Sequence, residues 1–207
     1  MEERESGASS RAAPRPGPAA EPSWVDRVVA VTHWPDDRSA AAVDRAAVEA
    51  RLGTALPGDY KELADRFGYG EFDDHLGLLL PDGPPGSLDL VSFHAFWART
   101  AAEDGGRWWE PYGLHPAPGG LLQWASTEQR TSFHWLTEAD DPDRWPVLVT
   151  GEDYAHWHRF DGSTAEFIHR LLTDPRQPGS TARHFDRHFF TSFEDRAGED
   201  GLPAGAG

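Results

Sequence analysis

Residues 120–160 read GLLQWASTEQRTSFHWLTEADDPDRWPVLVTGEDYAHWHRF and carry the strongest structural signal in the chain. Four runs of strand type predict strands over 120–126, 131–136, 145–150 and 154–160. The links between these runs are short and contain Asp, Glu, Gly and Pro, which are typical of turns. Strands that are joined by short links pair antiparallel with their neighbours. The stretch therefore predicts an antiparallel meander.

Helical periodicity flanks this region on both sides. Before it, apolar residues at helical spacing predict helices over 23–34, 39–53 and 56–68. After it, the sequence STAE has the spacing of a capping box and predicts a helix over 163–174. Helices before and after a run of strands indicate an α+β fold. We expect a single domain in which helices pack mainly on one face of an antiparallel meander sheet.

The segment between these regions has a mixed pattern. Leu76–Leu80 is a short apolar run between turn residues and predicts a strand, and Leu88–Val91 predicts a second, weaker one. Residues 93–104 place Phe and Trp at helical spacing and predict a helix. Residues 105–119 are rich in Gly and Pro and predict a loop.

The two ends of the chain differ from its middle. Residues 1–22 are rich in Ala, Pro, Gly and Ser and predict a disordered tail, and residues 194–207 predict a flexible acidic tail. All nine Trp lie between these tails, so residues 23–193 are expected to form the domain. Residues 178–193 contain four Phe and predict an added element that packs on the domain or, alternatively, a hydrophobic surface for a partner.

Charge and composition exclude several classes of function. The 35 acidic and 19 basic residues give a net charge of −16, and residues 23–193 carry −12 of it. Such a surface repels nucleic acid and anionic membranes and favours a basic protein partner. The alternative is that the acidity only keeps the chain soluble. Because the chain has no cysteine, disulfides, zinc–thiolate sites and cysteine nucleophiles are excluded.

Several patterns of known function do not occur. The chain has no run of about 18 apolar residues, and its N-terminus lacks the apolar stretch of a secretory signal, so we expect a cytoplasmic protein. Neither GxxxxGK[ST] nor GxGxxG follows a predicted strand, and Gly-x-Ser-x-Gly is absent. The sequence therefore offers no support for nucleotide chemistry or for a hydrolase nucleophile.

Several segments occur in an order that is typical of one family. They are LGTALPGDYKEL at 52–63 with FGYG at 67–70, GLLQWA at 120–125, FHWL at 133–136, DRWPV at 143–147 and EFIHRLL at 166–172. Together they resemble the SUKH superfamily over about residues 24–175. Ala125 stands where this family commonly has Gly, and residues 84–119 match no pattern of the family.

The resemblance implies an α+β domain without catalytic chemistry. The superfamily includes the Smi/Knr regulators of yeast cell-wall synthesis and many bacterial immunity proteins, which bind a toxin domain and block its active site. Many of those toxins are basic nucleases, and the acidity of this chain fits such a partner. We expect an immunity protein. The alternatives are a regulatory or scaffold module with no toxin partner and a metal-dependent enzyme.

The candidate partner-binding residues are acidic residues in predicted turns and one aromatic pair in the predicted loop. If the acidic loops lie on one side of the sheet, they form a patch for a basic toxin. The alternative is turn chemistry, because an Asp side chain bonds nearby backbone. An exposed Trp pair would anchor a partner, whereas a buried pair would cover the core. The candidates are Asp73, Asp74, Asp140, Asp141, Asp143, Glu152, Asp153, Trp108 and Trp109.

One pair of histidines has the spacing of metal ligands. His156 and His158 are two residues apart on a predicted strand, so both side chains point to the same face and would offer two nitrogens to zinc. A third ligand, such as His134 or Asp153, would be required. The alternative is a half-exposed strand face with Trp157 turned inward. We expect the second alternative, and with it no metal, no cofactor and no catalytic residue.

Overall fold

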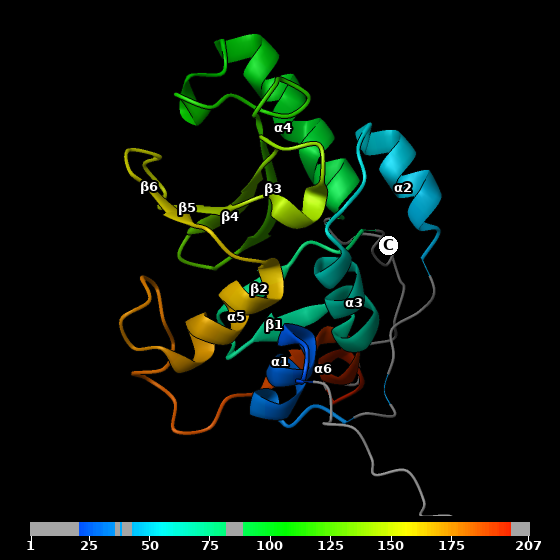
Figure 1. The fold of residues 1–207 in the computed structure, drawn as a ribbon, viewed down its shortest axis with the longest axis vertical. Helices are drawn as coiled ribbons and strands as arrows, with labels where there is room; N and C mark the ends of the chain where they lie inside the picture. The colour runs from blue at the N-terminus through cyan, green and yellow to red at the C-terminus, as the bar shows by residue number, and fades with distance from the viewer. Residues whose placement is uncertain (1–20, 36–37, 39–42, 82–88, 200–207) are drawn as a thin grey trace, which may run out of the picture.

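The computed structural model describes residues 21–35, 38, 43–81 and 89–199 (Figure 1). In this part of the chain the strands are β1 (Gly70–Phe72), β2 (Leu76–Leu78), β3 (Leu121–Ser126), β4 (Ser132–Leu136), β5 (Val147–Thr150), β6 (Trp157–Phe160) and β7 (Phe190–Ser192). The helices are α1 (Trp24–Thr32), α2 (Arg45–Leu52), α3 (Gly58–Phe67), α4 (Leu90–Asp104), α5 (Thr164–Thr173) and α6 (Phe193–Glu199). Two 3₁₀ turns complete the set, η1 (Arg107–Trp109) and η2 (Pro142–Arg144).

The strands form one antiparallel sheet in the order β6-β5-β4-β3-β2-β1-β7. The predicted meander is confirmed, because β3 to β6 pair in chain order. At the other edge, β7 returns from near the end of the chain and pairs with β1, with Gly70 opposite Ser192. The sequence does not predict β1 and β7, because neither of these three-residue strands lies in a longer apolar run like the one that predicts β2.

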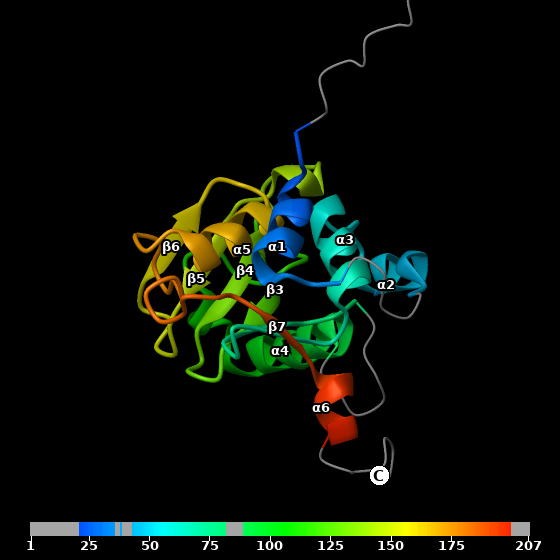
Figure 2. The same cartoon turned by 90° about the horizontal axis from the view of Figure 1, so that it is seen from below.

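Helices cover the two faces of the sheet unequally. On one face α1, α3 and α5 enclose the main core, where Tyr60 of α3 contacts the ring of Trp135 on β4 edge to face. α4 and the loop that contains η1 cover the opposite face, and Figure 2 shows α1 and α5 on one side of the sheet with α4 on the other. The prediction of an α+β domain with helices mainly on one face is confirmed, and α4 is the exception.

The ends of several helices follow the predicted caps. Ser23 Oγ accepts a hydrogen bond from the Asp26 amide (3.0 Å), and the Asp26 carboxylate accepts one from the Ser23 amide (3.0 Å), which completes a capping box on α1. Ser163 Oγ accepts from the Glu166 amide (3.3 Å) at the start of α5. α3 ends at Gly68, whose φ of 72° lies in the region that only Gly adopts readily.

Several predicted element boundaries differ from the structure: β2 ends at Leu78, β5 begins at Val147 and β6 begins at Trp157. Leu90 and Val91 belong to α4 rather than to a strand, because Asp89 accepts a hydrogen bond from the Ser92 amide (2.8 Å) and caps a helix there. A pair of buried apolar residues fits either element, and the cap selects the helix. α2 begins at Arg45 behind an Asp44 cap, and the predicted start of that helix at 39–42 lies outside the described residues.

The C-terminal segment packs on the domain, in line with the first of its two predicted alternatives. Phe190 of β7 is buried, and its ring lies 5.0 Å from that of Phe67 and 4.8 Å from that of Phe72. The tail predicted from residue 194 is instead helical in α6, up to Glu199. Residues 200–207, and the predicted tail at 1–22 apart from Glu21 and Pro22, lie outside the described residues.

A bulge in β3 sets the polar side chains that the sheet presents to α4. The register shifts between Gln123 and Ala125, so Trp124 and Ala125 both enter the main core. Gln123 and Ser126 consequently face the α4 side together, although they are three residues apart. Among the described residues, no helix is both long and apolar enough to cross a membrane.

Candidate functional site

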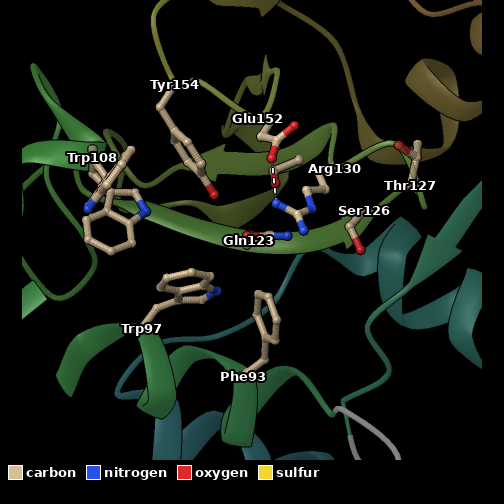
Figure 3. Close-up of a pocket in the computed structure, with 11 residues that line it drawn as sticks. Phe93, Trp97, Trp108, Gln123, Ser126, Thr127, Arg130, Glu152 and Tyr154 are labelled. Carbon is tan, nitrogen blue, oxygen red and sulfur yellow. Dashed lines mark hydrogen bonds and ion pairs between the residues drawn. The ribbon is translucent and has the colours of Figure 1, made fainter. Parts of the chain in front are cut away.

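A cleft of about 570 Å³ opens on the α4 face of the sheet, within the range of volumes that bind small groups. Its aromatic residues come from α4, η1 and the β5–β6 link: Phe93, Trp97, Trp108, Trp109 and Tyr154. Its polar residues come from β3, β4 and the links beside them: Gln123, Ser126, Thr127, Arg130, Ser132 and Glu152. Figure 3 shows Gln123 on the strand that forms the floor, with aromatic rings around it and the Arg130–Glu152 pair at one side.

The aromatic wall on α4 follows from helical spacing. Phe93 and Trp97 are four residues apart, so they lie on the same face of the helix. Their ring centroids are 5.9 Å apart, and the ring of Trp97 meets that of Trp109 edge on at 5.6 Å. The predicted helix over 93–104 therefore supplies one wall of the cleft.

The η1 loop returns the chain over the sheet. Gly105 and Gly106 have φ values of 80° and 71°, which let the chain reverse directly after α4. Trp109 is then buried, at 1% exposed, whereas Trp108 is 51% exposed. Of the predicted Trp pair, one ring covers the core and the other faces solvent at the cleft. Burial removes Trp109 from the partner-binding candidates.

The rim of the cleft combines an ion pair with unusual backbone geometry. Arg130 Nη1 lies 2.5 Å from Glu152 Oε1, and the two side chains are 74% and 64% exposed. Arg130 has a φ of 61° and Tyr154 a φ of 52°. Left-handed backbone costs a non-glycine residue roughly 1–2 kcal/mol, and such residues cluster at binding sites. Two of them line this single cleft.

The floor offers polar groups with free bonding capacity. Gln123 is 6% exposed, and its Nε2 donates to the carbonyl of Ala125 (3.2 Å). Within the described residues its carbonyl oxygen has no partner, and neither has the hydroxyl of Ser132, which is also 6% exposed. The buried Nε1 of Trp97 likewise lacks an acceptor. Buried polar groups are normally paired, so these groups are available to a bound molecule.

His134 lies beside this floor and is charged only in strong acid. Its ring is fully buried, 5.4 Å from the ring of Trp157 and 6.5 Å from that of Tyr154. Neither ring nitrogen makes a hydrogen bond of good geometry in the described structure. Burial lowers the pKa of His134 to about 3, so the imidazole is neutral at pH 7.

The acidic candidates do not form one patch. In an antiparallel meander, successive links fall at opposite ends of the strands. The β4–β5 link carries Asp140, Asp141 and Asp143, whereas the β5–β6 link carries Glu152 and Asp153. The two groups therefore lie at opposite ends of the sheet, and only the second adjoins the cleft.

Two of the five candidate carboxylates in these links bond nearby backbone, as the turn alternative predicts, and a third bonds backbone of α3. Asp141 Oδ1 accepts from the Asp143 amide (3.1 Å), and Asp153 Oδ1 accepts from the Ala155 amide (3.1 Å). Asp143 Oδ1 accepts from the Gly58 amide (2.5 Å) and so ties the link to α3. Asp140 is exposed and makes no bond of this kind with the described residues.

Asp73 and Asp74 form the β1–β2 turn and have different roles. Both have positive φ, 52° and 48°, as a tight hairpin turn requires. Asp74 is exposed and lies 3.1 Å from Arg196. Asp73 is 1% exposed and accepts hydrogen bonds from the Thr181 hydroxyl (2.5 Å) and the Phe189 amide (3.1 Å). The carboxylate thus anchors the C-terminal segment, and burial removes Asp73 from the partner-binding candidates.

The predicted histidine pair does not gather a third ligand. Cross-strand partners share a face of the sheet, and His134 is opposite Leu148 whereas His158 is opposite Val149. Since consecutive strand residues face opposite sides, His134 and His158 lie on opposite faces. His156 and His158 are exposed at the β6 edge. No group of three His, Asp or Glu side chains in the described residues is placed to hold a metal ion.

Sequence reasoning found part of this cleft and missed its floor. Trp108 and Glu152 were predicted as partner-binding residues, and both line the cleft. Gln123 and Arg130 were not. The available signal was Gln123 itself, a polar residue in the middle of the apolar run LLQWA. Arg130 gives no signal, because its backbone conformation and its partner depend on the folded turn.

Fold and cleft together give an α+β domain with a cleft that five aromatic and six polar residues line, and no metal-binding cluster in the described part. Comparison of the chain with family models, with curated proteins and with solved structures finds no match in any of the three. The resemblance to the SUKH superfamily and the function that it implies therefore remain predictions.

Proposed function

We propose that the chain is a non-catalytic protein-binding domain, and specifically an immunity protein that neutralises a basic, nuclease-type toxin. The observation that carries this proposal is the surface beside the cleft. Among the described residues, the large hydrophobic side chains that remain exposed are Phe96, at 49%, and Trp108, at 51%. Both belong to the α4–η1 segment that walls the cleft. Exposed aromatic residues grouped around a pocket are typical of protein-binding surfaces.

The charge of the domain supports a basic partner. The described residues include 28 acidic and 16 basic ones, a net charge of −12. An excess of this size attracts a basic protein and speeds its association, whereas it repels nucleic acid. An immunity protein gains from fast association, because it must reach the toxin before the toxin reaches its substrate.

The ionisable groups of the cleft support a role without catalysis. Arg130 and Glu152 bond each other and are mostly exposed, so neither is held ready to transfer a proton to a bound substrate. Tyr154 is the remaining ionisable residue of the lining. His134 stays neutral behind the floor and adds no charge.

The test is to co-express the chain with each toxin domain that is encoded next to its gene, and to follow growth. We expect growth to be restored and a stable complex to elute from a sizing column. Trp108→Ala should weaken this complex, whereas Trp24→Ala, which changes an aromatic residue far from the cleft on α1, should not. A complex that forms without restoring growth would favour the regulatory or scaffold alternative, and no binding of any neighbouring toxin would count against the proposal.

A further inference from the structure

We propose that the aromatic cleft binds an arginine side chain of the basic partner, which pairs with Glu152 in place of Arg130 of the chain itself. This inference rests on the proposed function, because it assigns a chemistry to the partner. It follows from three properties of the cleft: its rings, its unused hydrogen-bond acceptors and the weak ion pair at its rim.

The rings fit a flat cation. Trp97, Trp108 and Tyr154 come from three different segments, and Figure 3 shows their rings around one space. Trp108 and Tyr154 have ring centroids 6.2 Å apart and planes inclined at 70°, so they form two walls of a corner. A guanidinium stacks on aromatic faces, and it is less strongly hydrated than the ammonium of lysine. The walls therefore favour arginine.

The floor supplies acceptors for a group that only donates. A guanidinium has five N–H donors and no acceptor. The bond from Gln123 Nε2 to the Ala125 carbonyl fixes the amide, and the carbonyl oxygen of Gln123 is left without a partner among the described residues. The hydroxyl of Ser132 lies on the same floor, and both residues are 6% exposed. Gln123 and Ser132 thus line the cleft beside the rings, each with an oxygen that has no hydrogen-bond partner among the described residues.

The rim ion pair can exchange its cation at small cost. Arg130 and Glu152 are 74% and 64% exposed, and pairs exposed to this degree contribute little to stability. Arg130 is also held with left-handed backbone, at a φ of 61°. An arginine from the partner would replace Arg130 on Glu152 and would gain the ring and floor contacts in addition. The net charge of −12 on the described residues favours the incoming cation.

The direct test uses short peptides as probes. The peptide acetyl-Gly-Arg-Gly-amide is titrated into the full-length chain, and the indole N–H signals of Trp97 and Trp108 are followed by NMR. Matched peptides carry lysine or citrulline, which has the shape of arginine but no charge. We expect the arginine peptide to shift both signals and to bind about tenfold more tightly than the citrulline peptide.

Two variants test the contributions of Glu152 and Arg130 to peptide binding, and a third serves as a control. Glu152→Gln should lower the affinity for the arginine peptide about fivefold. The control is Glu128→Gln, which removes a charge from the β3–β4 link outside the cleft lining and should change the affinity little. Arg130→Gly removes the competing side chain, and Gly adopts a positive φ without strain. This variant should bind the peptide more tightly than the natural chain. Thermal unfolding of each variant verifies that its fold is intact.

Several outcomes would overturn the inference. Equal affinity for the citrulline peptide would show that charge is not recognised, and weaker binding by Arg130→Gly would show that Arg130 does not hold the place of the ligand. The same experiments distinguish failure of this inference from failure of the proposed function. If the chain neutralises a toxin but Glu152→Gln and Arg130→Gly leave the affinity for that toxin unchanged, the inference fails and the function stands. If the peptide binds as expected and no toxin is neutralised, the function fails alone.

Discussion

The imidazole of His134 links the region behind the cleft to the stability of the whole domain. The pKa of this group is lowered by burial from an ordinary value of 6.5 to about 3. Between these values the unfolded chain binds a proton that the folded chain does not bind, so the free energy of unfolding falls as the pH falls. The stabilisation by neutral His134 is complete above pH 6.5 and is lost progressively toward pH 3.

We therefore predict that acid destabilises the domain through this residue by roughly 1 kcal/mol at most for each pH unit below 6.5. Burial also lowers the pKa of His75, His94 and His169, which contribute in the same direction. Urea unfolding at a series of pH values from 4 to 8 measures the slope. His134→Leu should make the slope shallower, and an unchanged slope would contradict this assignment.

A second prediction concerns the two carboxylates of the β1–β2 turn. Asp73→Asn should lower the free energy of unfolding by about 2 kcal/mol, because a buried carboxylate that bonds the Thr181 hydroxyl, the Phe189 amide and Nδ1 of His188 (2.7 Å) becomes a neutral amide. Asp74→Asn is the matched control, since Asn tolerates positive φ equally at both positions. Because Asp74 is exposed, Asp74→Asn should lower the free energy of unfolding by less than about 1 kcal/mol. Chemical denaturation of both variants makes the comparison, and equal losses would contradict the anchoring role of Asp73.

At the scale of elements, the pairing of β1 with β7 depends on a close approach that only Gly permits. A Cβ on Gly70 would lie 2.2 Å from the Thr191 carbonyl oxygen and 2.6 Å from the Phe190 ring. A Cβ on Gly77 of the adjacent β2 would meet its nearest atom at 3.7 Å, an ordinary contact. Substitutions at the two glycines therefore provide a matched test of the pairing between β1 and β7.

We predict that Gly70→Ala separates β7 from β1 and that Gly77→Ala leaves the sheet intact. In Gly70→Ala, backbone amides of 190–192 should exchange with solvent much faster, and limited proteolysis should cut the chain between β7 and α5. Amide hydrogen exchange of both variants provides the measurement. Equal protection of the 190–192 amides against exchange in the two variants would show that the pairing of β1 with β7 tolerates the methyl group.

The elements that sequence could predict were those with enough residues to show a period. The meander β3–β6 has strands of four to six residues with turn chemistry between them. β1 and β7 have three residues each, and their pairing brings together distant parts of the chain. The start of α4 resembles a strand in sequence, because Leu90 and Val91 are apolar and buried in either element, and the Asp89 cap distinguishes the helix.

At the scale of the whole molecule, the site was only partly predictable because it is assembled from separate segments. Trp108 and Glu152 could be singled out by residue type and by their loops. The position of Gln123 depends on the β3 bulge, and burial of Asp73 depends on a segment more than a hundred residues later in the chain. Residue type indicates what a side chain can do, whereas exposure and neighbours follow from the complete fold.

The separation of the acidic links gives a prediction for the whole surface. Asp140→Asn with Asp141→Asn, and Glu152→Gln with Asp153→Asn, remove the same charge from opposite ends of the sheet. The second pair adjoins the cleft, so it should slow association with a basic partner more strongly and make the rate less dependent on salt. Stopped-flow association at several salt concentrations compares them. Equal effects would show that only the net charge matters.

The position of β7 also sets the order in which the sheet is completed during translation. Gly70 and its partner Ser192 are about 120 residues apart. Because ribosomes add roughly 5–20 residues per second, β7 is synthesised on the order of 10 s after β1. During that interval the outer backbone groups of Gly70–Phe72 are an open edge. Nascent copies on one polysome lie side by side with that edge uncovered, and it is there that pairing between chains competes with folding.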